Sequence, residues 1–150
     1  MTRSLRAAIW LGGIALLAAT AIDTLAVIGR HLGIPVTGSI ELMQAAVLVS
    51  GALGLTIATI VQSHARVRLF VDRLSPPAQT FADRLSDALS LIFFLALFAG
   101  SLWISIDLWD AHEKSEILGV PWRLLRLFAN ACLIIAAASL ALRIVRKVQS

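Results

Sequence analysis

Charge and cysteine are both scarce in this 150-residue sequence, and each shortage excludes a class of protein. Charged residues make up 15% of the chain, against roughly 25% in an average soluble domain, whereas apolar residues reach 59%. This balance excludes a disordered chain and almost any soluble globular domain. The single cysteine, Cys132, cannot form an internal disulfide, which excludes a disulfide-stabilised scaffold. The mean hydropathy of +0.87 instead favours a protein that crosses a membrane several times.

Four long apolar runs account for this composition. They cover residues 7–28, 42–61, 88–106 and 122–142. Each is close to the roughly 20 residues that a helix needs to cross the hydrocarbon core, and inside lipid a helix satisfies its own backbone hydrogen bonds. The prolines, which break helices, fall outside these runs: Pro35, Pro76, Pro77 and Pro121. We therefore predict an all-α integral membrane protein in which residues 1–150 form a single domain of four transmembrane helices.

The distribution of lysine and arginine predicts how these helices are oriented. With the N-terminus in the cytoplasm, nine of the 13 basic residues fall on the cytoplasmic side: Arg3, Arg6, Arg66, Arg68, Arg73, Arg84, Arg143, Arg146 and Lys147. The other four fall on the outer side: Arg30, Lys114, Arg123 and Arg126. Because cytoplasmic connections carry the excess of basic residues, we expect both termini in the cytoplasm. The same rule accounts for the net charge of +4, so we expect no nucleic acid partner.

The connection between the second and third spans has the pattern of a helix that lies on a membrane. Four of its apolar residues fall on one helical face: Val67, Phe70, Val71 and Leu74. Charged residues occupy the rest of the circumference, which predicts a short basic amphipathic helix on the inner leaflet. The residues assigned to this inner-leaflet segment are His64, Arg66, Arg68, Phe70 and Arg73. The alternative is a solvated loop in which the spacing is accidental.

The residues after this segment predict the start of a further helix. Ser75 is followed by two prolines, the order expected of a cap residue and a first helical turn. Phe81, Leu85 and Leu89 then recur at intervals of four, which predicts an amphipathic stretch that leads into the third span.

Patterns that would support catalysis or a cofactor are missing from the sequence. The three histidines, His31, His64 and His112, all lie in connections, so no pair of them can hold a haem within the bilayer. Cysteine and histidine never occur at metal-ligand spacing, and there is no nucleophile elbow, phosphate-binding loop or dinucleotide fingerprint. We therefore expect the protein to be no enzyme and to bind no cofactor or metal.

Five charged residues lie within the predicted spans or at their ends, where charge is costly. Asp23, Asp107 and Arg126 all lie toward the outer surface. They could form a proton or ion relay. We favour pairing between helices or snorkelling to the headgroups, because carriers bind their cargo near the midplane. Arg30 ends the first span, and Glu41 begins the second, where its negative charge suits the helix dipole.

Small residues recur at every fourth position along the second span. They are Ala46, Ser50, Gly54 and Ala58. This spacing lets another helix approach closely. That helix could belong to this chain or to a second subunit, and we favour packing within the chain. The fourth span is rich in alanine and contains Asn130, which predicts a packed helix rather than a lipid-facing one.

The segment from Arg30 to Pro77 carries several motifs that together resemble one family. Thirteen of its residues fit the pattern: Arg30, Thr37, Gly38, Ser39, Glu41, Leu42, His64, Arg66, Val67, Leu69, Leu74, Pro76 and Pro77. A later stretch, Leu-Gly-Val-Pro-Trp at 118–122, resembles the turn of the same family into its fourth span. In this order and with this topology, the chain resembles the small permease subunit (DctQ-like) of TRAP transporters, the tripartite ATP-independent periplasmic type. One position departs, since Arg68 stands where the family usually has an aspartate.

The resemblance implies an accessory role in transport. In that family a periplasmic binding protein captures an organic acid, a large permease subunit carries it inward with sodium, and the small subunit anchors the large one. We therefore expect a multi-pass protein of the bacterial inner membrane that carries no substrate site. Its expected partners are the large permease subunit, the periplasmic substrate-binding protein and membrane lipids. Tripartite tricarboxylate carriers also have a four-span small subunit, and membership of that family is the closely related alternative.

A rival hypothesis from another class is a self-sufficient small carrier, a proton-coupled homodimer of four-span subunits. Such a carrier needs an essential carboxylate in the membrane, and Asp23 is the candidate within the first span. These carriers are usually shorter, and they lack a long amphipathic connection between spans two and three. A membrane enzyme or electron carrier is a third and weaker hypothesis.

Overall fold

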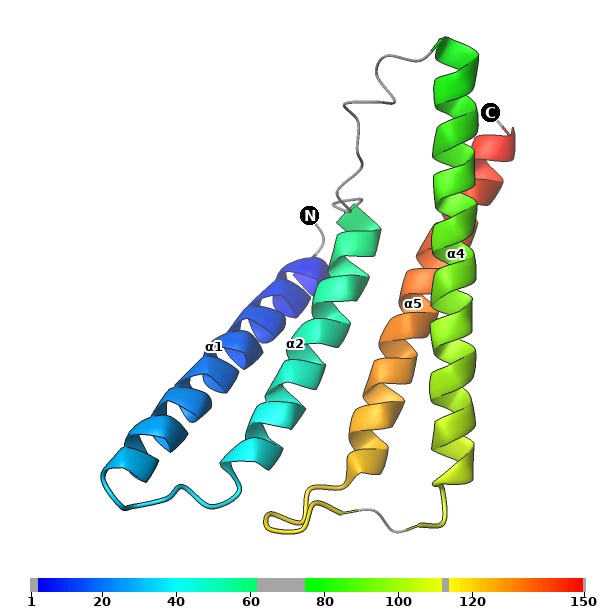
Figure 1. Ribbon diagram of the computed structural model, residues 1–150. Coiled ribbons are helices and arrows are strands. Elements are labelled where there is room, and N and C mark those ends of the chain that lie inside the picture. Colours follow the sequence, from blue (N-terminus) through cyan, green and yellow to red (C-terminus); the bar gives the residue numbers. More distant parts are fainter. Residues whose placement is uncertain (1–2, 62–74, 112–113, 150) are drawn as a thin grey trace.

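The computed structural model describes residues 3–61, 75–111 and 114–149, and these residues form four long helices (Figure 1). The helices are α1 (Arg3–His31), α2 (Ser39–Val61), α4 (Pro76–Asp107) and α5 (Trp122–Gln149). Each contains one of the predicted apolar runs and extends beyond it at one end or both. All four are long and apolar enough to cross a membrane. The prediction of an all-helical chain with four candidate membrane spans is therefore confirmed.

The predicted inner-leaflet segment lies outside the described residues. This applies to His64, Arg66, Arg68, Phe70 and Arg73 and to the amphipathic helix expected there. The next prediction along the chain is confirmed, because α4 begins at Pro76. Ser75 takes the N-cap position in an extended conformation, and prolines occupy the first helical positions. Proline is favoured there because the first amides of a helix have no acceptor within the helix.

The third predicted span turns out to be part of a longer helix. α4 has 32 residues, so it is about 48 Å long, against roughly 30 Å for the hydrocarbon core. Figure 1 shows its N-terminal part extending well beyond the end of α2. Phe81, Leu85 and Leu89 all lie on this continuous helix with exposed side chains. The expected amphipathic stretch and the third span are therefore one element.

The helices are arranged as an open row rather than a closed bundle. Among the described residues, the extensive contacts are those of α1 with α2, α2 with α5, and α5 with α4. The row therefore runs α1–α2–α5–α4, with α5 between α2 and α4 (Figure 1). In the apolar part of α5, 28% of the residues are buried, against 11% in each of the other helices. Among the described residues, only a minority of positions in each helix is thus fully buried against the rest of the chain.

The small core lies between α4 and α5. It consists of Phe94, Ala136, Ala137 and Leu140, with Leu91 and Leu133 packed against it. Alanines on α5 let the two helices approach closely, as expected for helices that associate within lipid. α5 is thus the packed helix that its alanine content predicts.

Polar contacts hold α5 to both of its neighbours. Asn130 on α5 donates a hydrogen bond from Nδ2 to Ser105 Oγ on α4, at 3.0 Å. Thr56 on α2 donates to the backbone oxygen of Cys132 on α5, at 3.2 Å. In a low-dielectric surrounding a polar side chain needs such a partner, so these contacts specify which helix faces are adjacent.

α1 packs on α2 through small residues. Gly12, Ala19 and Ala26 are its buried residues, and they recur every seven positions along one face. A Cβ atom added at Gly12 would lie 3.4 Å from the Cβ atom of Leu53 on α2. The two helices are therefore already in van der Waals contact at this level.

Candidate functional site

Residues 32–38, 108–111 and 114–121 lie at one end of the row, which we call the loop end. α1 begins and α5 ends at the opposite end, which we call the terminal end (Figure 1). Two motif segments meet at the loop end: the one that opens α2 and the one that leads into α5. They are about 80 residues apart in sequence, and the contacts between them build the site described below.

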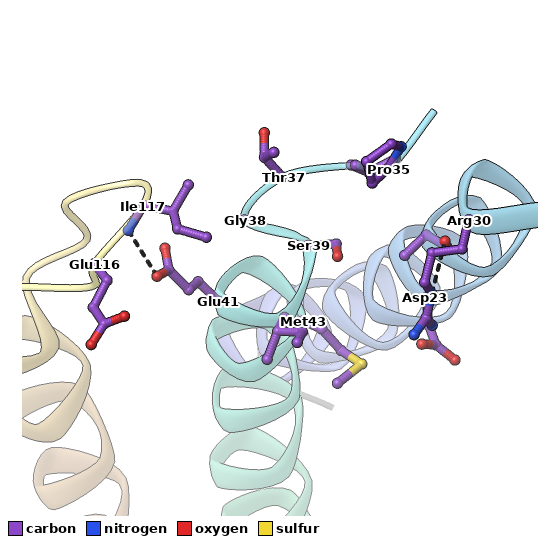
Figure 2. Close-up of a pocket in the computed structure, with 13 residues that line it drawn as sticks. Asp23, Arg30, Pro35, Thr37, Gly38, Ser39, Glu41, Met43, Glu116 and Ile117 are labelled. Carbon is purple, nitrogen blue, oxygen red and sulfur yellow. Dashed lines mark hydrogen bonds between the residues drawn. The ribbon is translucent and has the colours of Figure 1, made fainter. Parts of the chain in front are cut away.

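Glu41, in the first turn of α2, holds the connection that precedes α5. Its two carboxylate oxygens accept hydrogen bonds from the backbone amides of Ile117 and Leu118, each at 2.9 Å. Figure 2 shows the carboxylate pointing directly at this connection. Hydrogen bonds to a carboxylate are stronger than those between neutral groups. Neither the helix dipole nor the family motif predicts this contact from the sequence.

Gly38 allows this contact to form. Its φ angle is +77°, a conformation that side chains other than glycine rarely adopt. A Cβ atom at this position would also lie 2.8 Å from Cγ of Leu118. Both the backbone conformation and the close approach of Leu118 therefore require glycine, which gives a physical reason for the Thr-Gly-Ser-Ile-Glu-Leu sequence.

The connection held by Glu41 is itself a tight turn. The Ser115 amide donates to the backbone oxygen of Val120 at 2.9 Å, and Ser115 Oγ accepts from the Val120 amide at 2.8 Å. Lys114 and Pro121 form an isolated antiparallel bridge just outside this pair. The turn therefore presents the amides of Ile117 and Leu118 at its tip, where Glu41 receives them.

Arg123 fixes the other side of this connection. Its Nη2 atom donates a hydrogen bond to the backbone oxygen of Trp109. Its Cζ atom also lies 4.7 Å from the centre of the Trp109 ring, which is a cation–π contact. The end of α4 is thereby tied to the first turn of α5.

Three of the five predicted membrane charges surround one cavity at the loop end. This charged cavity has a volume of about 440 Å³ and lies between α1, α2 and the connection before α5. Asp23 and Arg30 extend into it from α1, and Met43 reaches toward them from α2 (Figure 2). Glu41 and Glu116 close the opposite side. Acids and a base from three elements are thus gathered around one space.

The other two predicted charges lie elsewhere. Asp107 is the last residue of α4 and is exposed, and Arg126 lies in the second turn of α5. Neither is among the described residues that line the charged cavity. The five charges therefore do not form one constellation at the loop end of the described structure.

The small-residue series of α2 lines a second cavity, which is apolar. Ser50, Gly54 and Ala58 face this space of about 460 Å³, together with Gly12 and Leu16 of α1. The surface between α1 and α2 is therefore hollowed beside Ser50, Gly54 and Ala58. Ala46, the first member of the series, is not among the described residues that line this cavity.

A buried ion pair that the sequence did not predict lies near the terminal end. Asp87 on α4 is only 1% exposed and forms a salt bridge with Arg143 on α5. Asp87 directly precedes the apolar run 88–106, so hydropathy alone assigns it to the connection outside the membrane. One signal could have revealed the pair: Asp87 and Arg143 have opposite charges, and each directly flanks the cytoplasmic end of a predicted span.

Four long apolar helices with polar contacts between them define a multi-pass membrane protein. The family model described as Tripartite ATP-independent periplasmic transporters, DctQ component, matches residues 19–150. The chain therefore belongs to the DctQ family, the small permease subunits of TRAP transporters, and is a transporter component rather than an enzyme. The family implies a tripartite transporter with a large permease subunit and a periplasmic binding protein. A comparison with curated proteins returned no match.

Proposed function

We propose that this subunit scaffolds and anchors the large permease subunit of a sodium-coupled organic acid transporter in the bacterial inner membrane. On this proposal the chain forms a single membrane domain and carries no substrate site of its own. The observation that carries the proposal is the open row of helices. A row buries little of each helix against the chain itself, so broad surfaces are left for a larger partner.

The proposal includes an orientation. We place the loop end at the periplasmic side and both termini in the cytoplasm. The support comes from the basic residues, nine of which would then lie on the cytoplasmic side and four on the outer side. The Glu41-held turn would then lie at the periplasmic surface, where the binding protein arrives.

The polar contacts along the row support a static role. Glu41 joins α2 to the connection before α5, Thr56 joins α2 to α5, and the Asp87–Arg143 pair joins α5 to α4. These contacts lie at different levels between the loop end and the terminal end. A row that is tied at several levels resists sliding of one helix past another, which is what an anchor for a moving transporter requires.

A reconstitution experiment tests the proposed function. The chain, the large subunit and both together are incorporated into liposomes with a sodium gradient. The radiolabelled organic acid is chosen as one that raises the melting temperature of the cognate binding protein. We expect uptake only from the complex and only with the binding protein present. Uptake by the chain alone would refute the proposal and favour the small-carrier hypothesis. Full activity of the large subunit alone would refute the scaffolding role.

A further inference from the structure

Two cavities lie one after the other along the α1–α2 pair. On α1, Ile9 and Leu16 line the apolar cavity, and Asp23 and Arg30 line the charged cavity. These four residues are seven positions apart, so they lie on one face of the helix. The two cavities are therefore successive parts of one surface on α1.

The same relation holds on α2. Met43 lines the charged cavity, whereas Ser50 and Ile57 line the apolar one, again at intervals of seven residues. Both helices thus turn one face toward the two cavities, and we call this shared surface the α1–α2 groove. Its part near the terminal end is apolar, and its part near the loop end is charged.

The apolar part of this groove is open. A Cβ atom added at Gly54 or at Gly13 would meet no described atom within 4 Å. By contrast, Gly12 sits against Leu53, where α1 and α2 touch. Gly54 and Gly13 therefore leave room on this side of the α1–α2 pair for a further helix to approach.

Asp23 places a carboxylate without a hydrogen-bond partner from the described residues in the charged part of the groove. It lies five residues before the end of the apolar run at Ile28, which is about 8 Å along the helix axis. Its side chain is exposed, and within the described structure it makes no hydrogen bond or ion pair. Arg30 instead donates from Nε to the Ala26 backbone oxygen at 3.3 Å. An exposed carboxylate at this depth is costly in lipid, and a hydrogen-bond donor on a partner helix would offset that cost.

We propose that the α1–α2 groove receives one transmembrane helix of the large permease subunit. This inference rests on the proposed function and names the surface that it uses. The incoming helix places apolar side chains against Leu16 and Gly54, and a basic or other hydrogen-bond-donating side chain at the level of Asp23. Charge complementarity at Asp23 sets the register of the two subunits.

Two other occupants fit the groove less well. A lipid acyl chain fills the apolar part but offers no donor at the level of Asp23. A second copy of the chain, packed about a two-fold axis through this groove, would bring two Asp23 carboxylates to the same level, where like charges repel. Both occupants are outcomes that the following experiment separates.

Photo-crosslinking tests the surface. A photo-crosslinking amino acid replaces Leu16 in the groove or, as a matched control, Leu95 on α4; these leucines are 56% and 49% exposed. The complex is irradiated in its native membrane. We expect an adduct with the large subunit from position 16 and none from position 95. A dimer adduct or only lipid adducts from position 16, while the large subunit still co-purifies, would overturn the inference and leave the proposed function intact. Failure of the large subunit to co-purify with the unmodified chain would count against the proposed function itself.

Substitution of Asp23 tests the chemistry. We expect Asp23→Leu to weaken association with the large subunit by about 3- to 30-fold, the range measured for hydrogen bonds between membrane helices. Asp23→Glu should restore much of it. Asp107→Asn, which changes an exposed carboxylate on α4, is the control and should have no effect. The thermal stability of the isolated chain reports on folding, and Asp23→Leu should not lower it. Unchanged association for Asp23→Leu would overturn the role given to Asp23.

Discussion

The ion pair between Asp87 and Arg143 provides the sharpest test of how the row is held together. Asp87 is 1% exposed, and the Arg143 side chain is 18% exposed, so the pair is largely removed from solvent. Removing one partner of a buried pair typically costs about 3–5 kcal/mol, because the other charge is left uncompensated. That corresponds to roughly two to three and a half powers of ten in the unfolding equilibrium.

The two single substitutions should not be equivalent. Arg143→Met leaves a short carboxylate buried between α4 and α5, and we expect the full loss. Asp87→Asn leaves an arginine whose long side chain can reach the headgroups at the terminal end, so the loss should be smaller. Replacing both residues with apolar ones of similar size should lower the free energy of unfolding by less than the sum of the two single losses.

Denaturant titration of the isolated chain in mild detergent measures these differences as a double-mutant cycle. Helix content by circular dichroism follows unfolding, and Asp107→Asn on the same helix serves as the control. The reasoning would be refuted if Arg143→Met cost no more than the control. It would also fail if the effects of the two single substitutions simply added in the double variant, because independent residues behave in that way.

Two further predictions concern the loop end. Glu41→Gln removes one of the two carboxylate acceptors, so hydrogen exchange should accelerate at the amides of Ile117 and Leu118. Exchange in the middle of α2 should stay unchanged, and equal exchange at the two amides in the unmodified chain and the variant would contradict the assigned contact. Gly38→Ala should destabilise the chain by about 1–3 kcal/mol in thermal unfolding, because it strains a backbone with positive φ and meets Leu118. Gly51→Ala, which has open space around it within α2, is the matched control and should be neutral or slightly stabilising. Equal melting temperatures for the two alanine variants would refute the argument.

Positions along the chain were predictable where the cause was local. Apolar runs of about 20 residues must form helices in lipid, because the backbone has no other hydrogen-bond partner there. The start of α4 was likewise predictable, since Ser75 and the prolines after it act within one helical turn. The full length of α4 was not, because hydropathy marks only its apolar part and gives no weight to residues 76–87.

The candidate site was only half predictable for the same reason. Glu41 could be singled out at the start of a helix, but its bonding partners lie 76 and 77 residues away and carry no side-chain signature, since they are backbone amides. Asp87 was passed over because it lies just outside an apolar run, although the fold buries it. Contacts between distant segments depend on which helix faces meet, and spacing along one helix does not contain that information.

Four membrane spans, their approximate limits and the family to which the chain belongs could all be inferred from the sequence. Tertiary structure alone decided the order α1–α2–α5–α4, the pairing of Asp87 with Arg143 and the gathering of Asp23, Arg30 and Glu41 around one cavity. The physical reason is the solvent. In water, an apolar face marks the side of a helix that packs, whereas in lipid both the packed and the exposed sides are apolar, so the small and polar residues that choose neighbours act only once the helices meet.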